Sequence, residues 1–322
     1  MKAIRVHQPG DREALQWEEL PDPHPKPGEA LVRLEAIGLN FIEVYQRMGL
    51  YPAPLPLTPG TEGAGRVVEI SAGVTAVKVG DRVAGVNFKG SYAELSLSAA
   101  DRLVVLPASI DTRVGAALML QGMTAHYLAT STYPLSRESH CLIHAAAGGV
   151  GLLLCQIARL RGAHIIGTVS TAEKAALAAR AGAQETVLYT RENFVERARQ
   201  SSGGVGVHVV YDSVGKTTFE SSLDALRPRG MLVLFGQSSG PVGAFDPQLL
   251  NRKGSLFLTR PTLGHYVATR EELLGRARDL FRWVEEGALE VRIDRSYPLA
   301  DAAEAHGALE GRQTTGKVLL IP

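Results

Sequence analysis

CLIHAAAGGVG, residues 141–151, is the stretch that decides the fold. A short apolar run leads through small residues into an apolar stretch of helical length, Gly151 to Leu160. This is the G-x-G-x-x-G dinucleotide-binding fingerprint, with Ala146 at the first glycine and Gly148 and Gly151 at the second and third. Gly148 lets the backbone approach a pyrophosphate, Gly151 lets the helix pack on the strand, and the helix N-terminus attracts phosphates. We therefore predict a phosphate-binding loop; the alternative is a tight structural turn. The loop residues predicted to bind a cofactor are Ala147, Gly148, Gly149, Val150 and Gly151.

The segments after this loop alternate between strand and helix patterns. Strand patterns lie at residues 164–169, 185–188, 207–211, 231–235 and 256–258, with helical patterns between most of them. Such alternation specifies a parallel, doubly wound sheet with right-handed crossovers, the Rossmann arrangement. The sequence thus predicts an α/β protein with a dinucleotide-binding domain over residues 124–262.

The flanking segments have the pattern of a mostly antiparallel β domain. Residues 1–123 contain short alternating runs bounded by Gly and Pro, for example 30–34, 65–70 and 91–95. An amphipathic helix is expected near residues 270–286, and a closing strand at 317–321 is expected to pair with the N-terminal sheet. We therefore expect the Rossmann domain to be inserted into a catalytic domain made of residues 1–123 and 263–322.

The end of the second predicted parallel strand discriminates between NAD and NADP. NAD enzymes usually place Asp or Glu there to bind the ribose 2′-hydroxyl. Here Ser170 follows the strand, Lys174 lies four residues later, and no acid precedes Glu173. A hydroxyl and an ammonium suit a 2′-phosphate, whereas a lone lysine is more commonly a solvated surface residue. We predict NADPH, bound by Ser170 and Lys174.

Composition excludes several classes of protein. The 322 residues carry 34 Lys+Arg against 33 Asp+Glu, a net charge of +1, so nucleic acid is not expected as the main partner. No segment has the length and apolar character of a signal sequence or a transmembrane helix, so we expect no membrane insertion. The two cysteines, Cys141 and Cys155, are interpreted as packing residues of a cytoplasmic protein.

Several motifs resemble a known family. The loop at 145–151 and the segment Gly60-Thr61-Glu62-Gly63-Ala64-Gly65 resemble the medium-chain dehydrogenase/reductase superfamily. The segments NFIEVY at 40–45, YDSVG at 211–215 and RP at 260–261 resemble its NADPH:quinone oxidoreductase branch, the zeta-crystallin-like proteins. The similarity runs through almost the whole chain. It implies a GroES-like catalytic domain, NADPH as the cofactor and a quinone as the acceptor.

The zinc site of the superfamily's alcohol dehydrogenases has no counterpart in the sequence. Those enzymes bind catalytic zinc through Cys, His and a third ligand, and the matching positions here are Asn40, Thr61 and Gln121. None of these is a good zinc ligand. No cysteine precedes Cys141, so the four-cysteine structural lobe is missing as well. We therefore expect no metal, and without a Lewis acid alcohol oxidation is not expected.

An acceptor that takes hydride without a metal has to be electron-poor already, as a quinone or an enone is. The protein then supplies positioning and exclusion of water. Asn40 is a candidate hydrogen-bond donor beside the nicotinamide ribose or the substrate. Tyr45 and Tyr51 are candidates to stack on the acceptor or to donate to a reduced oxygen. For Tyr51, an ordinary half-buried aromatic is an equally good interpretation.

The resemblance assigns further cofactor contacts by position. Thr124 matches a nicotinamide-side contact, and Tyr189 follows the third strand, where the family contacts the adenosine end. Arg260 and Arg312 resemble residues near the cofactor, although either is also compatible with a surface arginine. The residues expected after the fourth and fifth strands are Ser213, Phe235, Gly236 and Ser238.

Two other functions stay open. The same zinc-free hydride delivery reduces activated alkenes such as enals or enones, and the shape around Tyr45, Tyr51 and Gln121 would discriminate between acceptors. Relatives of the family also serve as lens proteins or bind AU-rich RNA, so a binding or structural role with retained NADPH affinity is the other alternative. The charge balance argues against RNA, and the phosphate loop argues against a purely structural role. The family commonly joins sheet edges, here residues 254–258, so we expect a homodimer.

Overall fold

The computed structural model describes all 322 residues, which form two compact units. The first comprises residues 1–123, 269–287 and 291–322, and the second comprises residues 124–268 and 288–290. The chain leaves the first unit within helix α2 (Thr112–Tyr127), at Met123. It returns after Ala268, six residues beyond the boundary expected from the sequence. The predicted α/β class, with a parallel sheet inserted into an antiparallel β region, is confirmed.

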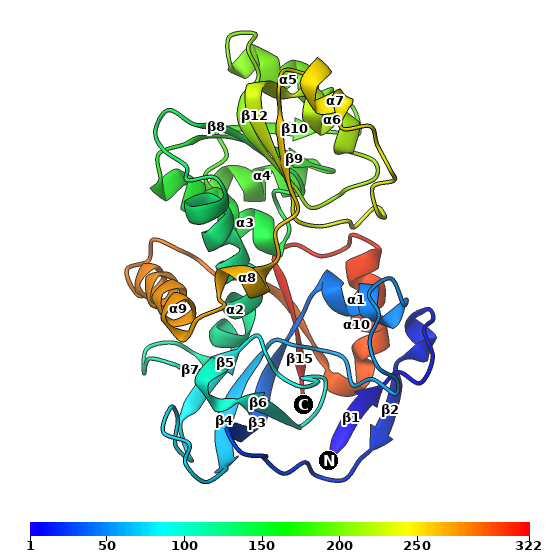
Figure 1. The fold of residues 1–322 in the computed structure, drawn as a ribbon, viewed down its shortest axis with the longest axis vertical. Coiled ribbons are helices and arrows are strands. Elements are labelled where there is room, and N and C mark those ends of the chain that lie inside the picture. The colour runs from blue at the N-terminus through cyan, green and yellow to red at the C-terminus, as the bar shows by residue number, and fades with distance from the viewer. The chain divides into compact units, whose positions relative to one another are not determined.

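The second unit is a doubly wound parallel sheet (Figure 1). Its six strands have the order β10-β9-β8-β11-β12-β13, so the order reverses between β8 and β11. Helix α3 packs against α4 and α5 packs against α6, and in Figure 1 these pairs lie on opposite faces of the sheet. The strands are β8 (His140–Ile143), β9 (His164–Val169), β10 (Glu185–Leu188), β11 (Val207–Asp212), β12 (Leu226–Leu234) and β13 (Phe257–Thr259). The helices are α3 (Gly149–Leu160), α4 (Ala172–Ala181), α5 (Phe194–Ser201), α6 (Phe219–Asp224), α7 (Gln248–Arg252) and α8 (Leu263–Tyr266).

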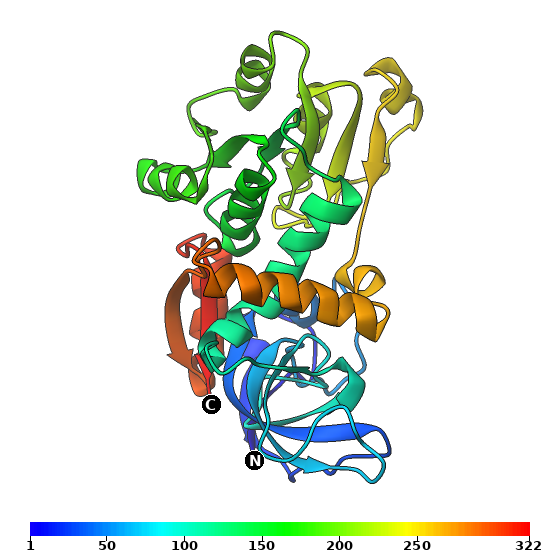
Figure 2. The ribbon, with the colours of Figure 1, turned by 90° about the vertical axis from the view of Figure 1, so that its left-hand side faces the viewer.

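The first unit contains a seven-stranded sheet, in which six strands have the order β14-β15-β3-β4-β5-β7 and the seventh, β6, pairs with β3, and a separate hairpin of β1 and β2. As predicted, the closing strand β15 pairs antiparallel with β3. Strand β14 pairs parallel with β15, which makes the sheet mixed, and Figure 2 shows α10 beside these two strands. The strands are β1 (Lys2–Arg5), β2 (Gln16–Glu19), β3 (Glu29–Leu39), β4 (Gly63–Ile70), β5 (Arg82–Gly85), β6 (Leu95–Ala99), β7 (Val104–Val105), β14 (Ile293–Pro298) and β15 (Lys317–Ile321). The helices are α1 (Phe41–Arg47), α9 (Arg270–Glu285) and α10 (Ala302–Glu310).

One expected strand of the first unit begins later than its alternating pattern indicates. Residues 91–95 were expected to form a strand, but the regular strand, β6, begins at Leu95. The preceding residues bond to several different segments: Ser91 N–H donates to Gly60 O and Glu94 N–H donates to Lys2 O. Ser91, Tyr92 and Ala93 are all fully buried, so burial in this segment does not follow the alternation of a strand with one exposed face.

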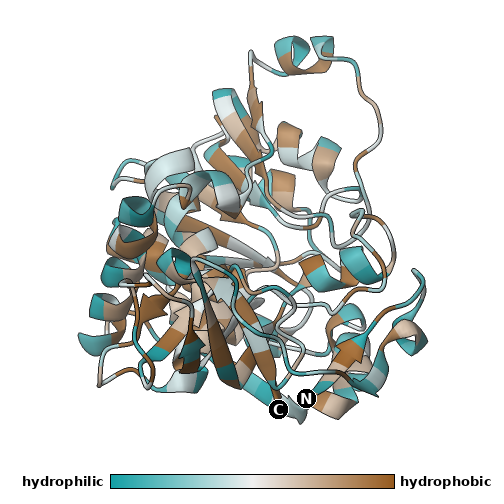
Figure 3. Ribbon diagram, turned by 60° about the horizontal axis from the view of Figure 1, so that its bottom comes forward, coloured by the Kyte–Doolittle hydropathy of each residue, from teal (hydrophilic) through white to brown (hydrophobic).

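Each unit has its own hydrophobic core. Ile37, Val83 and Leu320 belong to the core of the first unit, and Leu142, Ile166 and Val210 to that of the second. The strands are largely hydrophobic, whereas the helices carry alternating hydrophobic and hydrophilic segments (Figure 3). None of the helices is both long and apolar enough to cross a membrane. Both cysteines are free and fully buried, as expected for packing residues.

Candidate functional site

The predicted phosphate loop connects β8 to α3 at the carboxyl end of the parallel sheet. Ala145 adopts a left-handed φ of 50°, and Gly148 N–H closes the turn by donating to Ala145 O at 2.8 Å. Gly148 is the N-cap of α3 and supplies no side-chain cap. Because the first N–H groups of a helix have no intrahelical acceptor, the amides of Gly149 and Val150 suit a bound phosphate.

Glycines of this loop occupy positions that a side chain would obstruct. A Cβ on Gly151 would lie 2.3 Å from Ala145 O, and one on Gly148 would lie 3.1 Å from the same oxygen. A Cβ on Gly167 in β9 would lie 2.8 Å from the Ala146 Cβ, so this glycine lets the loop pack against the neighbouring strand. Ala147 is buried in the same turn. The loop is therefore a backbone cradle with room for a ligand that approaches its amides.

The segment after β9 carries the residues expected to recognise a 2′-phosphate. Ser170 directly follows the strand, and Thr171 caps α4 by accepting from the Lys174 N–H at 3.3 Å. This cap places Lys174 in the first helical turn, where its side chain is half-buried. Tyr189 directly follows β10, is 42% exposed, and is tied to β9 by its N–H, which donates to Val169 O. Ser170, Lys174 and Tyr189 therefore belong to one corner of the carboxyl edge.

The loops after β11 and β12 are joined to each other by backbone hydrogen bonds. Phe235 N–H donates to Asp212 O at 2.8 Å, and Ser238 N–H donates to Ser213 O at 3.1 Å. A Cβ on Gly236 would lie 2.6 Å from Ser213 O, so glycine is required for this close approach. The structure thus brings Ser213, Phe235, Gly236 and Ser238 together at the carboxyl edge, next to the β8 strand end, where the strand order reverses and α/β proteins bind ligands.

Three other predicted cofactor residues lie apart from these loops along the chain. Thr124 is buried within α2, at the first residue of the second unit. Arg260 is exposed and directly follows β13. Arg312 belongs to the first unit, where it lies in an exposed turn after α10 with a φ of 57°.

In the first unit, Asn40 lies at the centre of a buried polar cluster. The Asn40 Oδ1 atom accepts from Lys317 Nζ at 2.8 Å and from Gln121 Nε2 at 3.1 Å. Its Nδ2 atom donates to Glu62 Oε2 at 2.9 Å and to Gly38 O at 3.2 Å. Lys317 also forms a buried ion pair with Glu62. Both ends of the amide are thus engaged within the protein, which fixes its orientation.

Sequence reasoning missed Glu62 and Lys317 as members of this cluster. Glu62 is fully buried, and its Oε1 atom accepts from the Leu120 N–H. Lys317 is 1% exposed, although a lysine that opens a strand normally marks a solvated end. A gap of 255 residues separates the two, and no local pattern reveals such a pairing. The only available signal was the position of Glu62 within the motif Gly60-Thr61-Glu62-Gly63.

The residues at the superfamily's zinc positions do not fit zinc. Asn40 and Gln121 bond to each other through their amides, and the Lys317 ammonium already occupies Asn40 Oδ1. Thr61, the third position, offers only a neutral hydroxyl. Zinc sites use thiolate, imidazole and carboxylate ligands, and no group of three such residues in the chain is arranged to hold a metal.

Two predicted acceptor-side tyrosines lie together beside this cluster. The rings of Tyr45 and Tyr51 are 5.2 Å apart between centroids, and Tyr51 N–H donates to Tyr45 O. Tyr45 is buried in α1, while Tyr51 is half-buried in the following loop. Glu43, on the same helix, is fully buried and accepts from Asn40 N–H at 2.8 Å. Burial, only partly offset by Lys317, raises the pKa of Glu43 to about 8.

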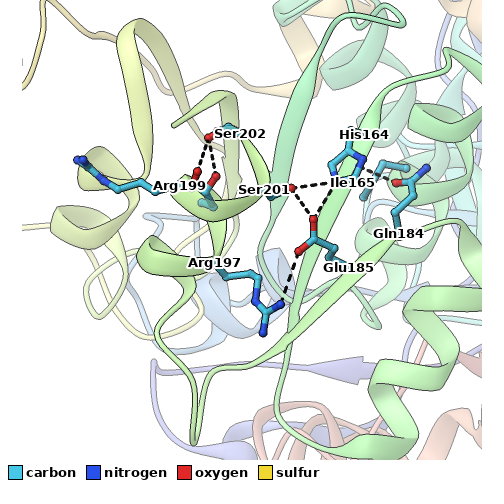
Figure 4. A network of polar contacts seen from close by, with 9 residues as sticks. His164, Ile165, Gln184, Glu185, Arg197, Arg199, Ser201 and Ser202 are labelled. Atoms are coloured by element: carbon cyan, nitrogen blue, oxygen red, sulfur yellow. Dashed lines mark hydrogen bonds and ion pairs between the residues drawn. The ribbon is translucent and has the colours of Figure 1, made fainter. Parts of the chain in front are cut away.

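The parallel sheet of the second unit also contains a polar cluster. It lies at the amino ends of the strands, whereas the cofactor loops follow their carboxyl ends (Figure 4). The Glu185 carboxylate at the start of β10 accepts from the Ser201 hydroxyl, contacts His164 Nε2 at 3.0 Å and lies 3.9 Å from Arg197. Burial raises the pKa of Glu185, but Ser201, His164 and Arg197 outweigh burial and lower it overall. This cluster joins the starts of β9 and β10 to the end of α5.

The parallel sheet inserted into a β domain and the glycine loop are the features of a medium-chain dehydrogenase/reductase. Residues 26–134 match the family described as alcohol dehydrogenase GroES-like domain, and residues 149–274 match the family described as zinc-binding dehydrogenase. The chain is 48% identical to the quinone oxidoreductase of Pseudomonas aeruginosa, across all of this chain and 99% of that protein. It therefore belongs to the quinone oxidoreductase family of this superfamily.

Other relatives show both the conserved fold and the diversity of the family. The structure of Escherichia coli quinone oxidoreductase complexed with NADPH superposes with a TM-score of 0.98 at 45% identity, over the full length of both chains. The 2-haloacrylate reductase of a Burkholderia species is 42% identical over 99% of this chain and 98% of that protein.

Proposed function

We propose that this protein is a zinc-independent oxidoreductase that transfers reducing equivalents from NADPH to a quinone. One observation carries the proposal: the glycine loop at the start of α3 shares the carboxyl edge with Ser170 and Lys174, and no acid directly follows β9. A 2′-phosphate needs donors and positive charge at this place and would be repelled by a carboxylate. The NADPH-complexed Escherichia coli relative supports the cofactor, and the names of the curated relatives support the acceptor.

Bound NADPH supplies the hydride, so the protein's residues need only bind, orient and exclude water. The loop of residues 147–151 surrounds the pyrophosphate and binds it through the free amides of Gly149 and Val150. Ser170 and Lys174 bind the 2′-phosphate. Thr124, Tyr189, Ser213, Phe235, Gly236, Ser238, Arg260 and Arg312 complete the proposed cofactor contacts.

On the acceptor side, we assign stacking and hydrogen bonding to Tyr45 and Tyr51. Both protons of Asn40 Nδ2 are engaged with Glu62 and Gly38. Asn40 therefore has no free N–H to donate to a substrate. Its side chain is held in one orientation by Lys317 and Gln121, and its role is to shape this part of the site. A quinone tolerates this arrangement because its reduced oxygens spread charge over the ring and take protons from water.

The test is NADPH oxidation followed by loss of its absorbance, with 1,4-benzoquinone and with an enone in parallel. NADH and a chelator serve as controls. Quinone turnover that prefers NADPH and ignores the chelator is expected. Turnover that needs a metal, or equal use of NADH, would contradict the assignment.

Reduction of an activated alkene is the second candidate, and the 42% identity to a 2-haloacrylate reductase favours it. The same assay separates the two functions, because turnover of the enone alone would replace the quinone assignment. NADPH binding without turnover of either acceptor would point to a binding or structural role.

We further propose a cytoplasmic homodimer joined through β13. The two buried free thiols fit a reducing compartment. Strand β13 is an edge strand of the parallel sheet, and its first residue, Phe257, is 57% exposed. An exposed apolar edge favours pairing with a second copy.

A further inference from the structure

A chain of buried polar side chains runs beneath the cofactor loops of the second unit. Thr168 Oγ1 lies 2.9 Å from His144 Nδ1, and His144 Nε2 lies 3.0 Å from Ser222 Oγ. The Ser222 hydroxyl donates to Asp212 Oδ2 at 2.9 Å. All four residues are at most 2% exposed. We propose that these residues position the cofactor loops as one body and thereby set the affinity for NADPH; this inference rests on the proposed function.

The hydrogen bonds of this chain all run in one direction. Asp212 accepts at both oxygens: from Val214 and Gly215 N–H at Oδ1, and from the Thr218 and Ser222 hydroxyls at Oδ2. Because Ser222 donates its proton to the carboxylate, its oxygen accepts from His144 Nε2–H. His144 Nδ1 is then the acceptor for the Thr168 hydroxyl. Burial lowers the pKa of His144, which favours this neutral tautomer although Asp212 acts in the opposite direction.

Three of the four residues, His144, Thr168 and Asp212, lie at the bases of different cofactor loops, and Ser222 of α6 connects His144 to Asp212. His144 follows β8 and directly precedes the phosphate loop, and Thr168 lies two residues before Ser170. Asp212 ends β11 and directly precedes Ser213. Its carbonyl also accepts from Phe235 N–H, which adds the loop after β12. Thr168 O accepts from Ala146 N–H at 3.1 Å, so the phosphate loop is held through backbone as well.

This arrangement makes the four residues positioning residues and not catalytic ones. They are too deeply buried to contact a bound cofactor, and α6, which supplies Ser222, carries no predicted cofactor residue. Buried polar groups cost free energy unless every partner is satisfied, and apolar side chains would pack the same space without that requirement. The hydrogen bonds of the polar side chains fix the positions of the strand ends relative to one another. A cofactor that contacts several loops at once requires such fixed positions.

The amino edge of the same sheet provides a matched control. There Ser201 contacts both His164 and Glu185, as Ser222 contacts His144 and Asp212, but Ser201 is half-buried and His164 also contacts Glu185 directly (Figure 4). We would compare Ser222→Ala with Ser201→Ala by NADPH fluorescence titration, thermal unfolding and steady-state kinetics. Ser222→Ala is expected to raise the NADPH Kd and KM about tenfold with kcat at saturating NADPH nearly unchanged. Ser201→Ala is expected to leave all three constants within about twofold of wild type.

A second pair of variants keeps the inference testable if Ser222→Ala fails to fold. Thr168→Val removes the hydroxyl at nearly constant shape, and Thr168→Ser retains it. The valine variant should bind NADPH about tenfold more weakly and the serine variant should restore binding. Equal NADPH affinity in Thr168→Val and Thr168→Ser, or a Ser222→Ala variant that loses thermal stability but no more affinity than Ser201→Ala, would overturn the proposal. Wild-type protein that binds no NADPH would instead overturn the proposed function itself.

Discussion

At the scale of single residues, the proposed preference for NADPH rests on the charge of Lys174. Lys174 is placed in the first turn of α4 by the Thr171 cap, a contact between residues three positions apart. An ammonium there favours a phosphate dianion over a hydroxyl. Ser170 adds a hydroxyl at the adjacent strand end, which either cofactor can use.

Lys174→Ala should therefore weaken NADPH binding far more than NADH binding. The expected loss is about 1.5–3 kcal/mol for NADPH if a charge-assisted hydrogen bond disappears. Titration of both cofactors by fluorescence measures the difference, and Lys174→Arg, which keeps the charge, is the matched control. Equal losses for NADPH and NADH would refute the assignment of Lys174 to the 2′-phosphate.

Glu43 gives the first unit an unusual pH dependence. Its folded pKa of about 8 lies above the unfolded value of 4.5, so the folded state holds a proton that the unfolded state has lost. The protonated Glu43 makes its full contribution to the free energy of unfolding below pH 4.5, and this contribution is lost as the pH rises to about 8. Between these values the free energy of unfolding falls by up to roughly 1.4 kcal/mol per pH unit.

Glu43→Gln removes this titration while keeping an acceptor for the Asn40 N–H. Chemical denaturation at pH 5 and pH 8 should show a smaller loss of stability in Glu43→Gln than in wild type. The exposed Glu286→Gln is the control and should follow wild type. A wild-type stability that does not fall relative to Glu43→Gln over this range would exclude a protonated Glu43.

At the scale of elements, sequence patterns were informative wherever the determinant is local. The alternation of strands and helices gave the strand starts at His164 and Glu185, and β15 pairs as its apolar pattern indicated. The glycine loop was identified because its constraints lie within eleven residues. The contacts that orient the loops were not predictable, because Ser222 reaches His144 across 78 residues and Lys317 reaches Asn40 across 277. A polar residue within a strand or helix pattern does not indicate which distant residue it will bond to.

The packing of α10 on α1 provides a prediction at this scale. Between these helices, His306 Nδ1 lies 3.1 Å from Arg47 Nη1, and its Nε2 lies 3.0 Å from the Tyr92 hydroxyl. Burial, reinforced by the Arg47 charge, lowers the pKa of His306 to about 3. The folded state thus excludes a proton that the unfolded state binds below pH 6.5.

The neutral His306 therefore makes its full contribution to the free energy of unfolding above pH 6.5, and this contribution is lost as the pH falls toward 3. His306→Gln cannot titrate, so its melting temperature should fall less than that of wild type between pH 7 and pH 4. His24→Gln is the control because His24 is exposed. Parallel melting curves for wild type and His306→Gln over this range would contradict the expected neutral, buried imidazole.

At the scale of the whole molecule, the edge of the parallel sheet at β13 is the proposed contact between two copies. The strand has only three residues, so backbone pairing with a second copy adds few hydrogen bonds. The exposed Phe257 is the apolar side chain that this edge offers to a second copy, and a two-fold axis would bury it twice. Burial of one phenylalanine contributes about 1.5–3 kcal/mol. A charge at this position should consequently separate the subunits.

Light scattering of the wild-type protein should give twice the 34.4 kDa mass of one chain, and Phe257→Lys should give the single mass. Val205→Lys is the matched control, since Val205 is also exposed, at 58%, but precedes β11 near the middle of the sheet order. It should leave the dimer intact. The Phe257→Lys monomer should still bind NADPH, because the proposed phosphate loop and the Lys174 corner lie in the strands on the opposite half of the sheet. A monomeric wild type at working concentration, or a dimer that persists in Phe257→Lys, would show that β13 is not the contact.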